Sequence, residues 1–126
     1  MSCYTNYSKI ILAAAKNQAL QGIVENANLM GTISNVSCQD SLTITGKINA
    51  EGVIANLLYQ GNGCILSQGS CALLVQYCLG KKIAEFRNLP EATFFEIVPV
   101  ENPAARQECF LLGWQALNKG IKAFKQ

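Results

Sequence analysis

The chain has 126 residues; half of them are hydrophobic, 14% are charged, and the formal net charge is +2. This length is enough to bury an apolar core without a disulfide or a structural metal, and the composition excludes a disordered chain. The low net charge argues against a nucleic-acid partner, and no apolar run approaches the roughly 20 residues of a membrane span, so we expect one soluble domain over residues 1–126.

The first half of the chain predicts a helix followed by an antiparallel sheet. Apolar residues recur at helical spacing between residues 5 and 16, and Gly22 marks the exit from this helix. Three strand candidates follow, of which the second alternates apolar and polar residues without a fault: 28–36, 42–48 and 53–60. The turn at 49–52 joins the last two strands into a hairpin over 41–60.

The second half of the chain predicts further helices. Its elements are, in chain order, a helix over 65–79, a short helical segment over 82–89, a Pro-rich connector over 90–103 and a long amphipathic helix over 107–124. Five residues carry the helical spacing in the first of these: Leu66, Ala72, Leu73, Gln76 and Leu79. We therefore expect an α+β fold, with a small three-stranded antiparallel sheet and helices packed mainly on one face.

The chain contains six cysteines: Cys3, Cys38, Cys64, Cys71, Cys78 and Cys109. The apolar run near the N-terminus has only seven residues and passes into polar sequence, unlike an export signal. We therefore expect a cytoplasmic protein whose thiols stay reduced. The sequence has no histidine, which excludes a cysteine–histidine hydrolase and limits any metal site to thiolates and carboxylates.

Three of the cysteines lie at the ends of predicted elements. Cys38 lies in a polar turn before a strand, Cys64 lies where a strand passes into a helix, and Cys109 lies in the first turns of the last helix. Such ends can converge at one edge of a small sheet, which would bring the three thiols near the carboxylate of Asp40. Three thiolates and one oxygen suit tetrahedral zinc, and thiolates also hold iron–sulfur clusters. Glu108 is an alternative source of the oxygen.

The segments around these cysteines resemble three motifs of one protein family. "SCQD", "GNGCILSQGS" and "ARQECFLLGWQAL" follow one another in the order of the cysteine motifs of the iron–sulfur cluster assembly family that includes IscU, SufU and the amino-terminal domain of NifU. The last motif is most similar to SufU, whereas the short interval before it is similar to IscU. The resemblance implies one SufE/NifU-like domain over residues 1–126.

The resemblance also implies a function. Such a protein receives sulfur from a cysteine desulfurase, binds zinc or iron or a transient iron–sulfur cluster, and supplies apo client proteins, as a scaffold or sulfur acceptor rather than a stand-alone enzyme. The implied ligands are Cys38, Asp40, Cys64 and Cys109. Cys38 is our choice of sulfur acceptor because its turn is expected to be the most flexible of the three segments.

Two alternatives remain beside the cluster scaffold. One is a SufU-type, zinc-dependent sulfurtransferase partner of the desulfurase, which would bind zinc tightly and carry no visible-absorbing cluster. The other is a homologue that keeps the fold and acts as an interaction module. Gln39 beside the first motif cysteine and Glu108 beside the third depart from the family pattern and support that alternative.

Other candidate residues have structural interpretations. Cys71 and Cys78 lie seven residues apart on one stripe of a helix, where a cysteine packs as a small hydrophobe. Ser67 and Ser70 either satisfy local backbone groups or touch the sulfur. Trp114 is expected in the core or at an interface.

Overall fold

The computed structural model describes residues 7–35, 40–62, 65–87, 90, 93–94, 96 and 107–124. Its elements, in chain order, are α1 (Tyr7–Ala15), the short 3-10 helix η2 (Gln18–Leu20), β1 (Leu29–Asn35), β2 (Asp40–Ile48), β3 (Ile54–Asn62), α2 (Ile65–Cys78), the short 3-10 helix η3 (Ile83–Phe86) and α4 (Gln107–Ala123). Every predicted strand and long helix is thus confirmed over the described residues. None of the described helices combines the length and the apolar character that a membrane span requires.

The three strands form one antiparallel sheet in the order β1-β2-β3. The first pair ends with Asn35 opposite Asp40, and the second pair begins with Ser41 opposite Asn62. The turn that joins β2 to β3 has Gly52 at a φ of 80°, a left-handed conformation that glycine adopts without strain. The predicted hairpin is therefore present, and both of its strands have one terminus at the end of the sheet where β1 stops.

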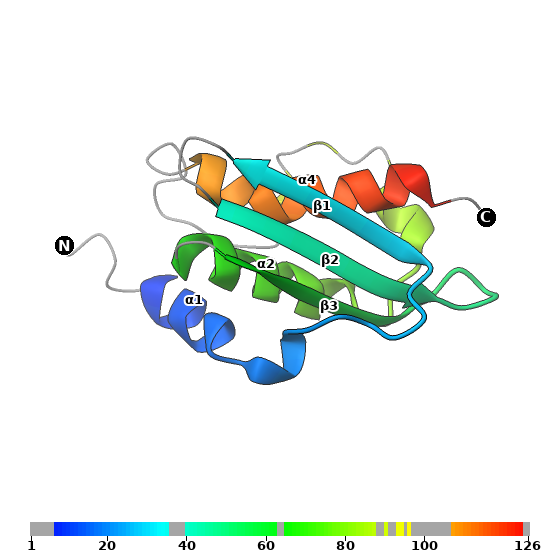
Figure 1. Ribbon diagram of the computed structural model, residues 1–126, viewed down its shortest axis with the longest axis horizontal. Helices are drawn as coiled ribbons and strands as arrows, with labels where there is room; N and C mark the ends of the chain where they lie inside the picture. The colour runs from blue at the N-terminus through cyan, green and yellow to red at the C-terminus, as the bar shows by residue number, and fades with distance from the viewer. Residues whose placement is uncertain are drawn as a thin grey trace.

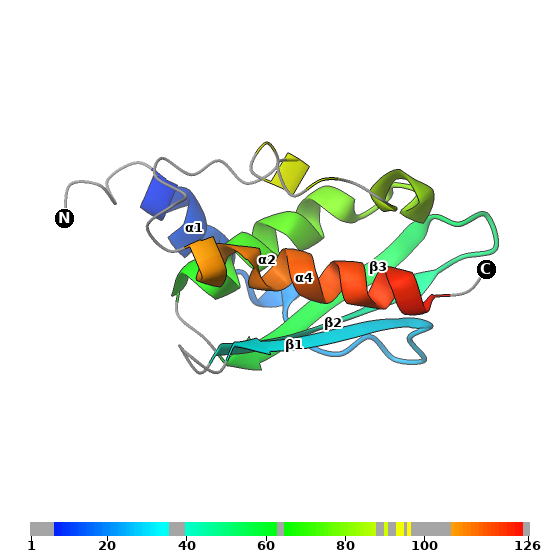
Figure 2. The same cartoon turned by 90° about the horizontal axis from the view of Figure 1, so that it is seen from above.

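The helices cover one face of the sheet, as Figures 1 and 2 show. Helix α4 packs along β1 and β2, α2 packs on β3, and α1 packs on the outside of α2. No described helix covers the opposite face, which Figure 1 views from the front. This arrangement confirms the predicted α+β fold with helices mainly on one face.

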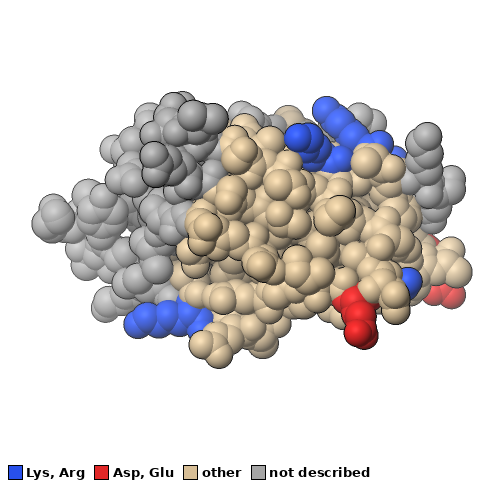
Figure 3. All heavy atoms as spheres, viewed as in Figure 1, with Lys and Arg blue, Asp and Glu red and all other residues tan. Residues whose placement is uncertain are grey.

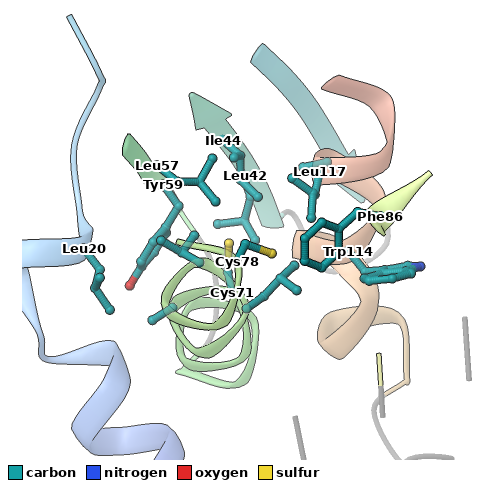
Figure 4. Close-up of a cluster of buried hydrophobic side chains, with 14 of the residues drawn as sticks. Leu20, Leu42, Ile44, Leu57, Tyr59, Cys71, Cys78, Phe86, Trp114 and Leu117 are labelled. Carbon is teal, nitrogen blue, oxygen red and sulfur yellow. The ribbon is translucent and has the colours of Figure 1, made fainter. Parts of the chain in front are cut away.

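Helix α2 lies at the centre of the molecule, and Figure 4 shows its two cysteines among side chains from the sheet and α4. The predicted stripe is wrong in detail, because Gln76 is exposed and Leu73 and Leu79 are only half-buried. The fully buried side chains of α2 lie on several sides: Ser67, Ser70, Cys71, Ala72, Leu74, Val75 and Cys78. A helix enclosed by the sheet, α1 and α4 has no single apolar stripe.

The segment predicted as a connector contributes to the core. Phe94 is fully buried, and its ring centroid lies 5.7 Å from that of Trp114 in α4. Trp114 is only 3% exposed, which confirms it as a core residue. The Pro-rich composition of this segment predicted a connector and gave no sign that Phe94 packs in the core.

Small residues let α4 approach its neighbours closely. A Cβ atom on Gly31 of β1 would collide with the backbone carbonyl oxygen of Ala116, and one on Gly120 would lie 3.1 Å from the carbonyl carbon of Met30. About two turns nearer the start of α4, a Cβ on Gly113 would lie 2.9 Å from the Sγ of Cys71 in α2. The backbone of α4 therefore lies directly against the backbone of β1 and against Cys71 of α2.

Candidate functional site

The segments that carry Cys38 and Cys64 begin and end at one end of the sheet. Cys38 falls in the chain between the end of β1 and the start of β2, and Cys64 falls between the end of β3 and the start of α2. The antiparallel register brings those ends together, since Asn35 pairs with Asp40 and Ser41 pairs with Asn62. Cys38 and Cys64 themselves lie outside the described residues.

The start of α4 lies at the same end of the sheet. In Figures 1 and 2, α4 runs alongside β1 in the opposite direction, so that its first turn lies where β1 ends. The contact of Gly120 with the backbone of Met30 and Gly31 fixes the position of the helix along the strand. From Gly120 back to Cys109, the helix extends about 16 Å, and from Gly31 to Asn35, the strand extends about 14 Å. The backbone of Cys109 is therefore level with the end of β1.

Asp40 and Cys109 are placed by their backbones only. Asp40 is the first residue of β2, and Cys109 is the third residue of α4. Glu108, the alternative oxygen donor, precedes Cys109 in the same turn. The structure thus brings the backbones of Asp40 and Cys109, two of the predicted ligands, to the same end of the sheet. The side chains of all four predicted ligands lie outside the part of the chain that the structure describes.

The described side chains hold no competing metal site. Among them, no group of three cysteines, aspartates or glutamates is placed to bind a metal ion. Cys71 and Cys78 are free thiols without exposed surface. Burial raises the pKa of both thiols, that of Cys78 to about 12, so both stay protonated at neutral pH. These two cysteines are packing residues, as predicted.

The glycine at the end of β3 has a structural role. A side chain on Gly61 would collide with the backbone carbonyl oxygen of Ser41 on β2. The close neighbour of Gly61 is thus the adjacent strand. The glycine therefore keeps β2 and β3 paired up to the end from which the chain continues to Cys64.

Two buried hydroxyl groups line the first half of α2. Ser67 and Ser70 are fully buried, and the hydroxyl of Ser70 donates a hydrogen bond to the backbone carbonyl of Ser67 at 3.3 Å. This bond supports the interpretation that at least Ser70 satisfies a local backbone group.

Sequence reasoning missed the small residues that position α4. Gly113, Ala116 and Gly120 repeat at helical spacing on the side of α4 that meets β1 and α2. That spacing is visible in the sequence, and it is the signal that could have identified the contact. These residues matter for the site because they fix where the first turn of α4 lies.

Comparison with known families decides the identity. The model of the NifU-like N-terminal domain matches residues 6–126. The chain belongs to the NifU-like N-terminal domain family. The match extends across all the elements of the fold, from α1 to α4.

Relatives within the family carry two different functional names. The iron–sulfur cluster assembly scaffold protein IscU of Thermotoga maritima is 28% identical over 132 residues, which cover 92% of each chain. The zinc-dependent sulfurtransferase SufU of Bacillus subtilis is 24% identical over 134 residues, which cover 93% of this chain and 90% of the relative. This NifU-like domain is therefore similar to members of both branches.

Solved structures agree with the fold. A candidate iron–sulfur cluster assembly scaffold protein for the SUF system from Fervidobacterium islandicum AW-1 superimposes with a TM-score of 0.76 at 25% identity, covering 94% of this chain and 98% of that one. The NifU-like N-terminal protein of Brucella abortus has a TM-score of 0.74 at 22% identity, covering 96% and 94%. The second likeness supports the fold alone.

Proposed function

We propose that this NifU-like domain is an iron–sulfur cluster assembly scaffold that accepts sulfur from a cysteine desulfurase and supplies clusters to apo client proteins. One observation carries the proposal: β1, β2, β3, α2 and α4 all begin or end at the same end of the sheet, where the three cysteine motifs fall in the chain. The functional names of the relatives support the same role. We place the reaction in the cytoplasm, where thiols stay reduced.

The proposed ligands fit the cargo of such a scaffold. They are Cys38, Asp40, Cys64 and Cys109. Three thiolates and one carboxylate suit iron–sulfur clusters and tetrahedral zinc alike. A carboxylate is the weakest of the four ligands for a soft metal site, so Asp40 is the ligand that we expect to be replaced when cargo leaves.

Sulfur transfer to Cys38 is a thiol exchange. The Cys38 thiolate attacks the outer sulfur of the persulfide on the desulfurase, a new sulfur–sulfur bond forms on Cys38, and the old bond breaks. The desulfurase cysteine leaves as a thiolate, so electrons balance without a further oxidant or reductant.

A second function is a zinc-dependent sulfurtransferase partner of the desulfurase. The similarity to SufU of Bacillus subtilis supports it. In that case zinc would be resident, and its charge would keep the ligand thiols deprotonated. Sulfur would still be accepted at Cys38, but no cluster would form.

Metal content tests the proposal and separates the two functions. Protein purified without oxygen should contain about one zinc or iron per chain by elemental analysis. Iron with sulfide and visible absorption indicates the scaffold, whereas zinc without visible absorption indicates the sulfurtransferase. Metal-free protein with six reduced cysteines would contradict both and favour an interaction module.

Cysteine variants test the ligand assignment. Replacing Cys38, Cys64 or Cys109 by serine should remove the metal, because each substitution removes one proposed thiolate. Cys71→Ser and Cys78→Ser are matched controls that should keep it, since both side chains are buried in α2. The substitution Cys3→Ser should also leave the metal in place. Equal metal loss in the two groups would refute the assignment.

A further inference from the structure

Within the described part of the chain, one edge of the sheet has no backbone partner. β1 is a terminal strand, and no described backbone group outside the sheet hydrogen-bonds to it. The opposite edge differs, because Gly22 donates to the carbonyl of Tyr59 at 2.8 Å and Ile54 donates to the carbonyl of Lys81 at 2.8 Å. Neighbouring backbone thus partly occupies the edge of β3, whereas the edge of β1 stays available within the described part of the chain.

β1 also lacks the features that normally block an edge strand. Its sequence, Leu-Met-Gly-Thr-Ile-Ser-Asn, contains no charged residue and no proline. Its register with β2 runs from Leu29 to Asn35 without a shift, so no bulge interrupts it. Met30 is 63% exposed on the uncovered face of the sheet. A regular, uncharged edge of this kind can pair with another strand.

Lys119 of α4 lies beside this edge, and Lys122, three residues later, is its neighbour on the exposed surface of the helix. Gly120 lies against the backbone of Met30 and Gly31, while Leu117 and Ile121 are buried on the interior side of α4. Helical geometry therefore directs Lys119 away from the interior, on the side where the edge of β1 lies. Lys119 and Lys122 are both exposed. Figure 3 shows basic side chains gathered over the C-terminal part of α4, at the rim of a sheet face that shows almost no charge.

We propose that the edge of β1, with Lys119 beside it and Lys122 next to Lys119 on α4, binds an extended acidic segment of a partner protein, which adds to the sheet as a fourth strand. Main-chain hydrogen bonds to β1 would provide affinity, and carboxylates facing the two lysines would provide orientation and selectivity. A second copy of this chain fits less well, because its β1 carries no acidic residue to face the lysines. The proposal is independent of metal binding.

A designed peptide tests the proposal. The probe is a seven-residue peptide that alternates glutamate with valine and threonine, titrated into the full chain at low salt and followed by amide NMR shifts. The expected shifts lie in β1 and in α4 near Gly120, and affinity should fall as salt is added. A version methylated on the backbone amides of one edge should lose binding, while methylation of the other edge should leave it unchanged.

Charge-reversal variants distinguish a specific effect of Lys119 and Lys122 from the effect of the net charge of the chain. Lys119→Glu with Lys122→Glu should weaken binding about tenfold, whereas Lys16→Glu with Lys82→Glu, at two other exposed lysines, should change it little. Equal binding of a peptide with lysine in place of glutamate, or shifts outside β1 and α4, would overturn the proposal. Shifts of β1 that depend on protein concentration without peptide would overturn it in favour of a self-interface.

Discussion

The middle of α2 and the end of the sheet both carry cysteines, but the fold treats them differently. Cys71 and Cys78 are enclosed on all sides, and burial raises the pKa of both thiols. The three motif cysteines fall where strands end and helices begin. A thiol inside a helix packed on every side is a space-filling group, whereas a thiol next to an element end can reach a ligand. Position in the fold, rather than residue type, therefore separates the two groups.

The largest effect should come from breaking the contact between β1 and α4, which positions the first turn of α4 at the end of the sheet. Gly31→Val would push a side chain into the backbone of α4 at Ala116, and we expect it to lower the free energy of unfolding by about 3 kcal/mol. Met30→Val is the control, because Met30 is 63% exposed on the uncovered face. Urea denaturation measures both variants. A loss below about 1 kcal/mol for Gly31→Val would mean that α4 is not held by this contact.

The buried thiols predict an intermediate effect that depends on pH. Their folded pKa values lie above the usual 9.0, so their contribution is complete below pH 9 and is lost as pH rises towards the folded values, about 12 for Cys78. Between these limits the free energy of unfolding should fall by up to about 1.4 kcal/mol per pH unit for each thiol. Burial also raises the pKa of Tyr59, which adds to the slope only above pH 10.

The variant Cys78→Ala measures how much this one thiol contributes to the fall of the unfolding free energy with pH. Denaturation under reducing conditions at pH 8, 9 and 10 should show a smaller fall for this variant than for the wild-type chain. The same slope in both proteins would mean that Cys78 titrates alike in the folded and unfolded states.

The smallest effect on stability concerns the carboxylate at the end of the sheet. If Asp40 is the replaceable ligand, Asp40→Ala should change the rate of cluster or metal transfer to a chelator and leave the free energy of unfolding nearly unchanged. If Asp40 only caps the turn, the variant should cost about 1 kcal/mol without changing that rate. Glu108→Ala is the matched variant. An altered rate in Glu108→Ala alone would assign the oxygen to Glu108, and unchanged rates in both would remove the carboxylate from the mechanism.

The sequence pattern predicts β2 more clearly than β1, and the packing of α4 explains the difference. β2 alternates apolar and polar residues throughout, because its inner positions face the core and its outer positions lie on the opposite face of the sheet. Polar side chains are satisfied there, since Lys47 is exposed and the buried hydroxyl of Thr45 accepts a hydrogen bond from the backbone of Val24. β1 alternates less regularly, because one of its inner positions is Gly31, where the approach of α4 leaves no room for a side chain. The contact that positions α4 requires a glycine in β1, and that glycine weakens the apolar–polar alternation by which a strand is predicted.

The helices and the site depended more on tertiary context. The apolar stripe of α2 could not be identified correctly because three neighbours bury it, and Phe94 was hidden in a Pro-rich segment. The candidate ligands could be named from their positions at element ends. That the ends carrying Cys38 and Cys64 meet follows from the register of Asn35 with Asp40 and of Ser41 with Asn62, which spacing along the chain does not contain.

The contact of Gly31 with Ala116 and Gly120 determines the rotation of α4 as well as its distance from the sheet. Each residue inserted or deleted in a helix turns everything beyond it by about 100° and moves it by about 1.5 Å. One residue added between Cys109 and Ala116 would thus leave the contact intact yet turn Cys109 by more than a quarter of a circle. Insertions or deletions between Cys109 and Ala116 should therefore disturb the site far more than substitutions in the same interval.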